Sequence, residues 1–216
     1  MPAVIKWPSS GCRLRENAYK EFIMMNSEVS KYSGLDIEGA INYDDSVKPD
    51  YTWDGLKMPF QSNLFDCAIA TEVLEHCPDP DIILNEVFRV LKNQSHLFLT
   101  IPFLWPLHEV PNDQYRYTPF SLQKHLEEAG FAEIKIRPLG GWHAAMAQML
   151  GLWVIRAPFS LMQRRFLKLL AIPFYKYLVK IDTKPKTFTE GSMITGLAAV
   201  AYKNDYTIKV DEVSKQ

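Results

Sequence analysis

The alternation of buried strands with amphipathic helices constrains the fold of this chain more than any other feature. Residues 65–70 and 97–101 are short, largely apolar runs, the pattern of strands that are covered on both faces. Between them, residues 80–91 carry apolar side chains at helical spacing, with Asp79 placed as the N-cap and acids in the first turn. Strands and helices that alternate in this way predict a parallel sheet covered by helices on both faces.

The pattern extends along most of the 216 residues. A chain of this length is long for one compact core and short for two, so we expect a single domain over residues 1–203 and a polar tail at 204–216. The predicted fold class is α/β, with a doubly wound, mostly parallel sheet. Further strands are expected at residues 3–7, 32–37, 51–53, 131–137 and 194–202, and further helices at residues 14–25 and 118–129.

Functional residues are expected where the strands of such a sheet end, because ligands bind outside the carboxyl ends of parallel strands. The loops after residues 37, 70 and 101 would share that edge. The loop at 105–118, WPLHEVPNDQYRYT, holds more hydrogen-bonding and aromatic side chains than a plain connection requires. It is therefore predicted to form part of a site.

Charge is distributed unevenly along the chain. The net charge is −1, yet residues 134–181 hold eight Lys or Arg and no acid, which favours an anionic ligand or an anionic membrane surface. Nucleic acid is not an expected partner, because the overall charge is slightly negative and no recognition motif occurs. The cysteines have no metal-ligand spacing, so no metal site is predicted, and they are expected to be reduced thiols of a cytoplasmic protein: Cys12, Cys67 and Cys77.

Residues 142–181 read as a basic, apolar helical insertion before the last strand. The segment is rich in Leu, Met, Phe and Trp, and Pro158 and Pro173 are expected to break it into short helices. Two interpretations stay open. The helices pack on the sheet with their bases extended to solvent, or residues 156–180 contact anionic lipid at the inner membrane face or cover an anionic substrate. The bases that would share one helical face are Arg164, Lys168, Lys176 and Lys180.

A spaced motif over residues 54–102 carries a family resemblance. Its parts are Asp54, MPF at 58–60, FD at 65–66, VLEH at 73–76, DP at 79–80 and EVFRVLK at 86–92. This segment resembles the class I S-adenosylmethionine-dependent methyltransferases, in particular the methyltransferase type 11 group, which have a Rossmann-like fold. Residues 102–118 and 139–150 are similar to a subgroup that occurs with enzymes of polysaccharide and glycan assembly.

The resemblance implies S-adenosyl-L-methionine as the cofactor. Asp36 would bind the ribose hydroxyls, which suits a carboxylate at the end of a strand. Asp54 would meet the adenine amino group. The other implied contacts are Ile37, the Gly55 backbone and, near the methionine part, Thr71 and Glu72.

The first strand departs from the family pattern. The loop that follows it, WPSSGCRLREN, has one glycine, Gly11, and no acid before it, where the family has an acid and a G-x-G turn. Gly11 is still the position that would approach the cofactor. We expect either a shortened, degenerate cofactor loop or a truncated N-terminus.

Methyl transfer from a sulfonium is an in-line displacement, so the enzyme mainly aligns acceptor, methyl group and sulfur. For a hydroxyl acceptor, His108 is the first candidate base, and Asp113 is either the alternative base or the partner that orients His108. Plainer pairings of His108 with Glu109 and of Arg116 with Asp113 would instead fix the loop, and His76 is expected to be structural. Acceptor contacts are predicted for Trp105, Glu109, Tyr115, Arg116 and Tyr117.

Two classes of function remain open. The first is a methyltransferase that acts on a hydroxyl of a sugar, a glycan or a lipid-linked intermediate, including anionic ones. The second is a non-catalytic methyltransferase-like scaffold that docks through its basic helical segment. A nicotinamide-dependent oxidoreductase is disfavoured, because the sequence lacks a G-x-G-x-x-G loop.

Overall fold

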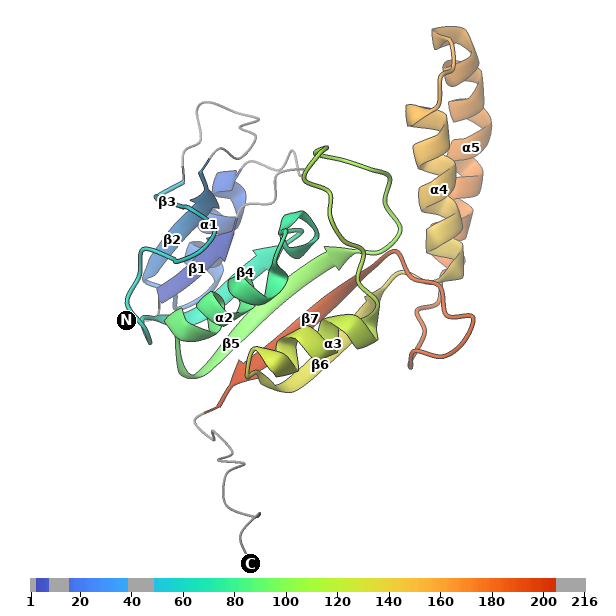
Figure 1. Cartoon of the computed structure of the whole chain (residues 1–216). Helices are drawn as coiled ribbons and strands as arrows, with labels where there is room; N and C mark the ends of the chain where they lie inside the picture. Colours follow the sequence, from blue (N-terminus) through green and yellow to red (C-terminus); the bar gives the residue numbers. More distant parts are fainter. Residues whose placement is uncertain (1–2, 8–15, 39–48, 205–216) are drawn as a thin grey trace, which may run out of the picture.

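The computed structural model describes residues 3–7, 16–38 and 49–204. A seven-stranded sheet with the order β3-β2-β1-β4-β5-β7-β6 forms its centre (Figure 1). Strands β1 to β5 are parallel, whereas β7 runs antiparallel between β5 and β6. The strands are β1 (Ala3–Trp7), β2 (Lys31–Ile37), β3 (Tyr51–Trp53), β4 (Phe65–Thr71), β5 (Leu91–Pro102), β6 (Ala132–Leu139) and β7 (Gly196–Lys203).

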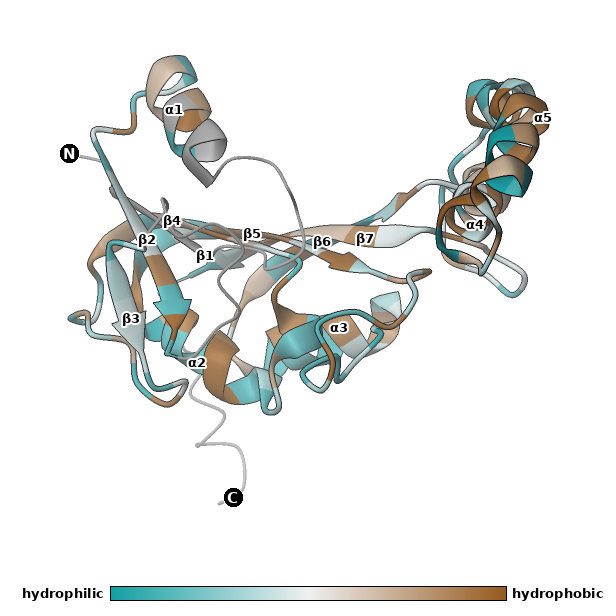
Figure 2. Cartoon of the chain, turned by 90° about the horizontal axis from the view of Figure 1, so that it is seen from above, coloured by the Kyte–Doolittle hydropathy of each residue, from teal (hydrophilic) through white to brown (hydrophobic). Residues whose placement is uncertain are grey.

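Helices cover both faces of the sheet, as the sequence predicts. Helices α2 and α3 lie on one face and α1 lies on the other (Figure 2). A short 3₁₀ helix, η1 (Leu74–His76), follows β4. The helices are α1 (Glu16–Asn26), α2 (Pro80–Val90), α3 (Pro119–Glu128), α4 (Trp142–Arg156) and α5 (Leu161–Ile181).

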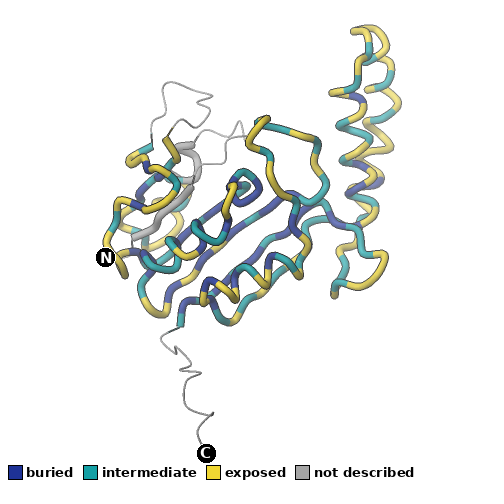
Figure 3. Tube along the Cα trace, in the orientation of Figure 1, coloured by how far each residue is buried: buried dark blue, intermediate teal, exposed yellow. Residues whose placement is uncertain are grey.

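The hydrophobic core lies between the sheet and the pair α2 and α3 (Figure 3). Each large apolar side chain that is fully buried there stabilises the fold by about 1.5–3 kcal/mol relative to its exposed state. The core includes Phe65, Leu97, Leu99 and Ile101 of the sheet, Ile83, Leu84, Val87 and Val90 of α2, and Leu122 and Leu126 of α3.

The predicted helix starts are confirmed in detail. The Asp79 side chain accepts hydrogen bonds from the amides of Asp81 and Ile82, and Pro80 occupies the first helical position, where its missing N–H costs nothing. Thr118 and Ser121 form a capping box at the start of α3.

Strand β5 begins earlier than the sequence predicts, at Leu91 and not at residue 97. The polar residues 92–95, KNQS, hide this part of the strand, since they read as a loop. In the structure Leu91 pairs with Phe65 and the Lys92 ammonium lies 2.8 Å from the Asp66 carboxylate, so the β4 edge holds the segment.

The basic insertion folds as a helical hairpin of α4 and α5, which contact each other and project beyond the sheet (Figure 1). Pro158 separates the two helices as predicted. The prediction for Pro173 is wrong, because this residue lies inside the continuous helix α5. The proline removes one backbone donor there, and the contacts of α5 along α4 hold the helix through it. No helix in the described ranges is both long and apolar enough to cross a bilayer.

An ion pair on α2 holds the segment that connects β3 to β4. The Glu86 carboxylate accepts from the Met58 amide at 2.7 Å and from Arg89 at 2.7 Å. The Arg89 guanidinium also donates to the carbonyl oxygens of Phe60 and Met58. Arg89 holds the pKa of Glu86 below its ordinary value. The pair therefore fixes the backbone around Met58 against α2.

Replacing Glu86 by Gln should lower the free energy of unfolding by about 1–2 kcal/mol near neutral pH, because a charge-assisted contact is lost. The folded-state pKa of Glu86 is depressed, so this stabilisation is present above the ordinary carboxyl pKa of 4.5 and is lost as the pH falls. Urea unfolding at several pH values measures both effects. The matched control is Glu128→Gln, since the Lys124–Glu128 pair is well exposed. Equal losses in the two variants would contradict the assignment.

Candidate active site

The parallel strands bring the predicted cofactor residues to one edge of the sheet. Asp36 and Ile37 close β2, and the register pairs Ile37 with Trp53, directly before Asp54. Thr71 closes β4 and pairs with Thr100 of β5. Residues that are far apart in the sequence thus form one row. Gly11 lies outside the described residues, so the prediction for the first cofactor loop stays a prediction.

A tight turn presents Asp54 and Gly55 at the end of β3. The Asp54 carboxylate accepts from the amides of Leu56 at 2.9 Å and Lys57 at 3.1 Å, and these hydrogen bonds lower its pKa. Gly55 has φ +83°, and a Cβ atom there would lie 3.0 Å from Cδ1 of Ile37. The turn thus requires glycine and leaves backbone where a flat ring can approach.

The end of β4 carries buried polar groups. The Glu72 carboxylate accepts from the Thr100 hydroxyl at 2.8 Å, and burial raises its pKa. Glu72 adopts φ +54°, so the chain turns sharply out of the strand. The Thr71 hydroxyl is buried and makes no hydrogen bond within the described part of the chain. This hydroxyl is a polar atom that a ligand at the edge can satisfy.

The loop at 103–118 is tied to η1 by its backbone. The amides of Gln114 and Tyr115 both donate to the Glu75 carbonyl, at 2.8 and 3.1 Å. The buried Tyr117 hydroxyl donates to the Leu74 carbonyl at 3.1 Å. These contacts bring the His108 ring to 4.7 Å from the His76 ring, centroid to centroid.

Asp113 and Arg116 form the internal pair that the plainer interpretation predicts. The guanidinium donates to both carboxylate oxygens, at 2.6 and 2.8 Å, and also lies within hydrogen-bonding distance of the carbonyls of Trp105 and Pro106. Arg116 lowers the pKa of Asp113 to about 2. Asp113 is therefore too weak a base for a hydroxyl, and Arg116 holds the loop instead of presenting its charge to an acceptor.

His108 keeps Asp113 as its partner, but the predicted pairing with Glu109 is wrong. The Nδ1 atom of His108 lies 3.4 Å from the Asp113 carboxylate, and the His108 amide donates to the same oxygen at 3.2 Å. Glu109 instead faces His76, with 3.6 Å between Oε2 and Nε2. Glu109 adopts φ +53°, so the backbone turns sharply at this residue.

The aromatic residues of the loop divide into two groups. Tyr117 is only 3 % exposed, so the prediction that it stacks on an acceptor is wrong. Trp105 and Tyr115 remain about two-fifths exposed, at 39 % and 41 %. These two side chains are available to an acceptor, although the Tyr115 hydroxyl already donates to the Pro78 carbonyl.

Sequence reasoning missed the side chains of Glu75 and His76 as part of this site. The Glu75 side chain is fully buried, and its Oε1 lies 3.7 Å from Nε2 of His76. Burial raises the pKa of Glu75 to about 8. The signal in the sequence is the adjacent acid and imidazole directly after a buried strand, in VLEH, where the sequence alone predicts a structural role for His76.

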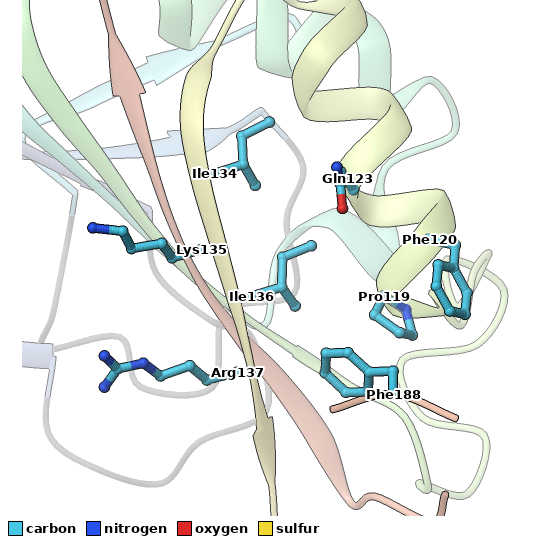
Figure 4. A pocket seen from close by; sticks show the side chains of 8 residues that line it. All are labelled: Pro119, Phe120, Gln123, Ile134, Lys135, Ile136, Arg137 and Phe188. Carbon is cyan, nitrogen blue, oxygen red and sulfur yellow. The ribbon is translucent and has the colours of Figure 1, made fainter. Parts of the chain in front are cut away.

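Two cavities of about 420 Å³ border the sheet away from this cluster. The first lies between α3 and β6, where Ile134, Ile136 and Phe188 line it, while Lys135 and Arg137 point the other way (Figure 4). The second is on the face opposite α2 and α3 and includes Thr71, Lys135 and Arg137. Only the second therefore reaches a predicted cofactor residue.

Comparisons with known proteins agree with this architecture. Residues 24–99 match a family described as a methyltransferase domain. Cycloartenol-C-24-methyltransferase 1 of Oryza sativa subsp. japonica is 35 % identical over 79 residues, which cover 37 % of this chain and 20 % of the rice protein. The aligned segment thus spans about a fifth of that relative.

Solved structures of methyltransferases share the fold. A SAM-dependent methyltransferase from Archaeoglobus fulgidus superposes with a TM-score of 0.54 at 16 % identity, over 94 % of this chain and 86 % of that protein. Phosphoethanolamine N-methyltransferase 2 of Haemonchus contortus, in complex with S-adenosyl-L-methionine, gives a TM-score of 0.50 at 14 % identity, over 94 % and 49 % of the two chains. The chain therefore has the Rossmann-like fold of class I methyltransferases.

The two loop tyrosines give a matched test of the site's construction. Tyr117→Phe should lower the free energy of unfolding by about 1 kcal/mol, because a buried hydrogen bond to Leu74 is lost. Tyr115→Phe removes an exposed hydrogen bond and should cost less than about half of that. Urea unfolding of both variants measures the difference. A larger loss in Tyr115→Phe would mean that the loop is not held through η1.

Proposed function

We propose that this chain transfers a methyl group from S-adenosyl-L-methionine to a hydroxyl of a sugar, a glycan or a lipid-linked intermediate. The observation that carries the proposal is the row of Asp36, Asp54 and Gly55 at the carboxyl edge of the sheet, the same edge from which the loop that holds His108 emerges. The match of residues 24–99 to a methyltransferase domain supports the reaction type. Residues 102–118, which resemble the glycan-associated subgroup, support the acceptor class.

The described residues fit the cofactor. The Asp36 carboxylate can accept from two ribose hydroxyls, and the Asp54 turn on the adjacent strand can meet the adenine amino group. Gly55 leaves its backbone open to the ring, and the buried Thr71 hydroxyl needs a partner at the methionine end. When it is bound there, the cofactor supplies a methyl group on positively charged sulfur.

The acceptor side follows from the loop at 103–118. His108 lies on it with its Nδ1 atom 3.4 Å from the Asp113 carboxylate, and a hydrogen bond between the two would orient the imidazole toward a reacting group. Activation of the hydroxyl by such a group contributes typically about 10²–10⁴-fold. Trp105 and Tyr115 offer exposed aromatic faces to a sugar ring. Fixing the loop on η1 aligns these groups before the acceptor arrives.

Asp36→Ala should weaken the binding of S-adenosylhomocysteine about tenfold or more, because two hydrogen bonds to an ionised acceptor are lost. Isothermal titration measures the affinity. Glu38→Ala is the matched control, since Glu38 is an exposed acid two residues further on and should bind as the wild type does. Wild-type protein that is folded and binds no ligand at millimolar concentration would refute the proposed cofactor.

A second function, docking on a membrane, is favoured by the α4–α5 hairpin. The hairpin holds six Lys or Arg and no acid. Large apolar side chains lie exposed along it: Trp142, Met146, Met149, Trp153 and Ile155 on α4, and Leu161, Met162, Phe166, Leu169, Leu170, Phe174 and Tyr177 on α5. Apolar side chains among basic ones are typical of helices that lie in an anionic lipid interface. We place the chain in the cytoplasm, peripheral to the inner membrane face, either as an enzyme of lipid-linked acceptors or as a scaffold.

Flotation with lipid vesicles tests this docking. The wild type should float with vesicles that contain phosphatidylglycerol and not with pure phosphatidylcholine. Each base near an anionic surface contributes about 1 kcal/mol, so neutralising Arg164, Arg165 and Lys168 to Gln should weaken partitioning about a hundredfold. Neutralising Lys124, Lys184 and Lys186, which lie outside the hairpin, should have a much smaller effect. Unchanged flotation of the first variant would exclude the hairpin as the docking surface.

A further inference from the structure

The buried carboxylate of Glu75 is the least explained group in the described part of the chain. Its side chain is fully buried, and within the described residues neither oxygen accepts a hydrogen bond. The charge of Arg116 acts on Glu75, but the hydrogen bonds of Arg116 go to Asp113 and to backbone carbonyls. A carboxylate in this position requires a proton or a bound cation, because burial without a partner is unfavourable for its charge.

The groups around Glu75 favour a cation. The Nε2 atom of His76 lies 3.7 Å from Glu75 Oε1 and 3.6 Å from Glu109 Oε2. The other ring nitrogen, Nδ1, lies 3.2 Å from the Asn112 carbonyl, which accepts its proton and leaves a lone pair on Nε2. In this neutral form the lone pair faces two carboxylates and is repelled by them unless a proton or a metal ion lies between them.

His108 completes the cluster from the other side. One ligand atom each from Glu75, His76 and His108 lie within 4.8 Å of one another. The Nδ1 atom of His108 faces the Asp113 carboxylate, so Nε2 is the nitrogen that would bind. An imidazole that gives one nitrogen to a carboxylate or a carbonyl and the other to an ion is the usual arrangement of metal-binding histidines. His76 has it through the Asn112 carbonyl, and His108 would gain it through the Asp113 carboxylate, 3.4 Å from its Nδ1 atom.

We propose that Glu75, His76 and His108 bind a divalent transition-metal ion. Zinc lies about 2.0–2.2 Å from nitrogen and oxygen ligands, so its ligands are a little closer together than these atoms are here. Modest side-chain rotations close that difference. Two imidazoles with a carboxylate suit ions from Mn²⁺ to Zn²⁺ better than Ca²⁺ or Mg²⁺, which prefer oxygen alone.

The position of the cluster suggests what the ion does, and this step rests on the proposed function. The Glu75 side chain lies on the buried side of the cluster, whereas the side chains of His76 and His108 are 13 % and 15 % exposed. The other side of a bound ion is therefore accessible from the loop at 103–118, the acceptor loop. A bound ion lowers the pKa of a hydroxyl that coordinates it. The hydroxyl then loses its proton to solvent, the oxygen forms a bond with the methyl carbon, and the carbon–sulfur bond breaks with its electron pair on sulfur. His108 thus activates the acceptor as a ligand of the ion.

The test is metal binding by the full chain after removal of metals with a chelator. Isothermal titration with Zn²⁺ and with Mn²⁺ should show one site per chain, and Mg²⁺ should bind more weakly. Glu75→Gln, which keeps the size of the buried side chain, and His76→Ala should each lower the affinity about tenfold or more. With Co²⁺ as the probe, the visible absorption of the bound ion should disappear in the same variants.

His125→Ala is the matched control. His125 also lies near two carboxylates, of Asp81 and Glu128, but it is already paired with Asp81 at 2.6 Å on the surface. This variant should bind metal as the wild type does. Folded wild-type protein that binds none of the ions, or equal losses in His125→Ala and His76→Ala, would overturn the inference.

The two proposals fail separately. Titration with S-adenosylhomocysteine on the same samples reports the cofactor site without the metal. Cofactor binding without metal binding would remove the ion and leave the proposed methyltransferase. Metal binding without cofactor binding would retain the metal site and refute the methyltransferase.

Discussion

The parallel register of β1 to β5 is the constraint on which the rest of the structure depends. Because these strands run in one direction, every turn that follows them emerges at the same edge. Asp36, Asp54 and Glu72 come together there although no local contact in the sequence joins them. The strand order reverses between the neighbouring strands β1 and β4, because the chain continues from β1 to β2 and β3 on one side and to β4 and β5 on the other. Sheets of this kind bind ligands at such a reversal.

Sequence reasoning predicted the parts of the fold that follow from local patterns. Buried strands such as β4 and caps such as Asp79 depend on neighbours along the chain, so their residues are sufficient to place them. The start of β5 depends on pairing with β4, which is distant in the sequence. The continuity of α5 through Pro173 depends on its contacts with α4. The Glu75 cluster was missed for the same reason, since its residues come from η1 and from the loop at 103–118, which only the folded sheet brings together.

The polar side chains of the acceptor loop mainly hold the loop in place and do not mainly contact a ligand. Most of its hydrogen-bonding groups are consumed within the molecule: Asp113 with Arg116, Tyr117 with Leu74, and the amides of Gln114 and Tyr115 with Glu75. A loop that satisfies itself in this way is rigid, and it presents only a few groups outward. Outward it presents the faces of Trp105 and Tyr115 and the apolar side chains of Leu107 and Val110, while His108 is mostly buried at its inner side.

The base of the α4–α5 hairpin joins the membrane surface proposed here to that loop. The Asp182 carboxylate accepts from the amides of Gly141 and Ala144, which caps α4 with the residue that ends α5. A Cβ atom on Gly141 would collide with the Thr183 carbonyl oxygen, so the close approach of the two helix ends requires glycine at this position. The Gln148 side chain of α4 donates to the Leu104 carbonyl, directly before Trp105. If the hairpin lies in a lipid interface, it therefore holds the acceptor loop at a fixed distance from that surface. The hydroxyl of a lipid-linked acceptor would then meet the loop at that same distance from the lipid.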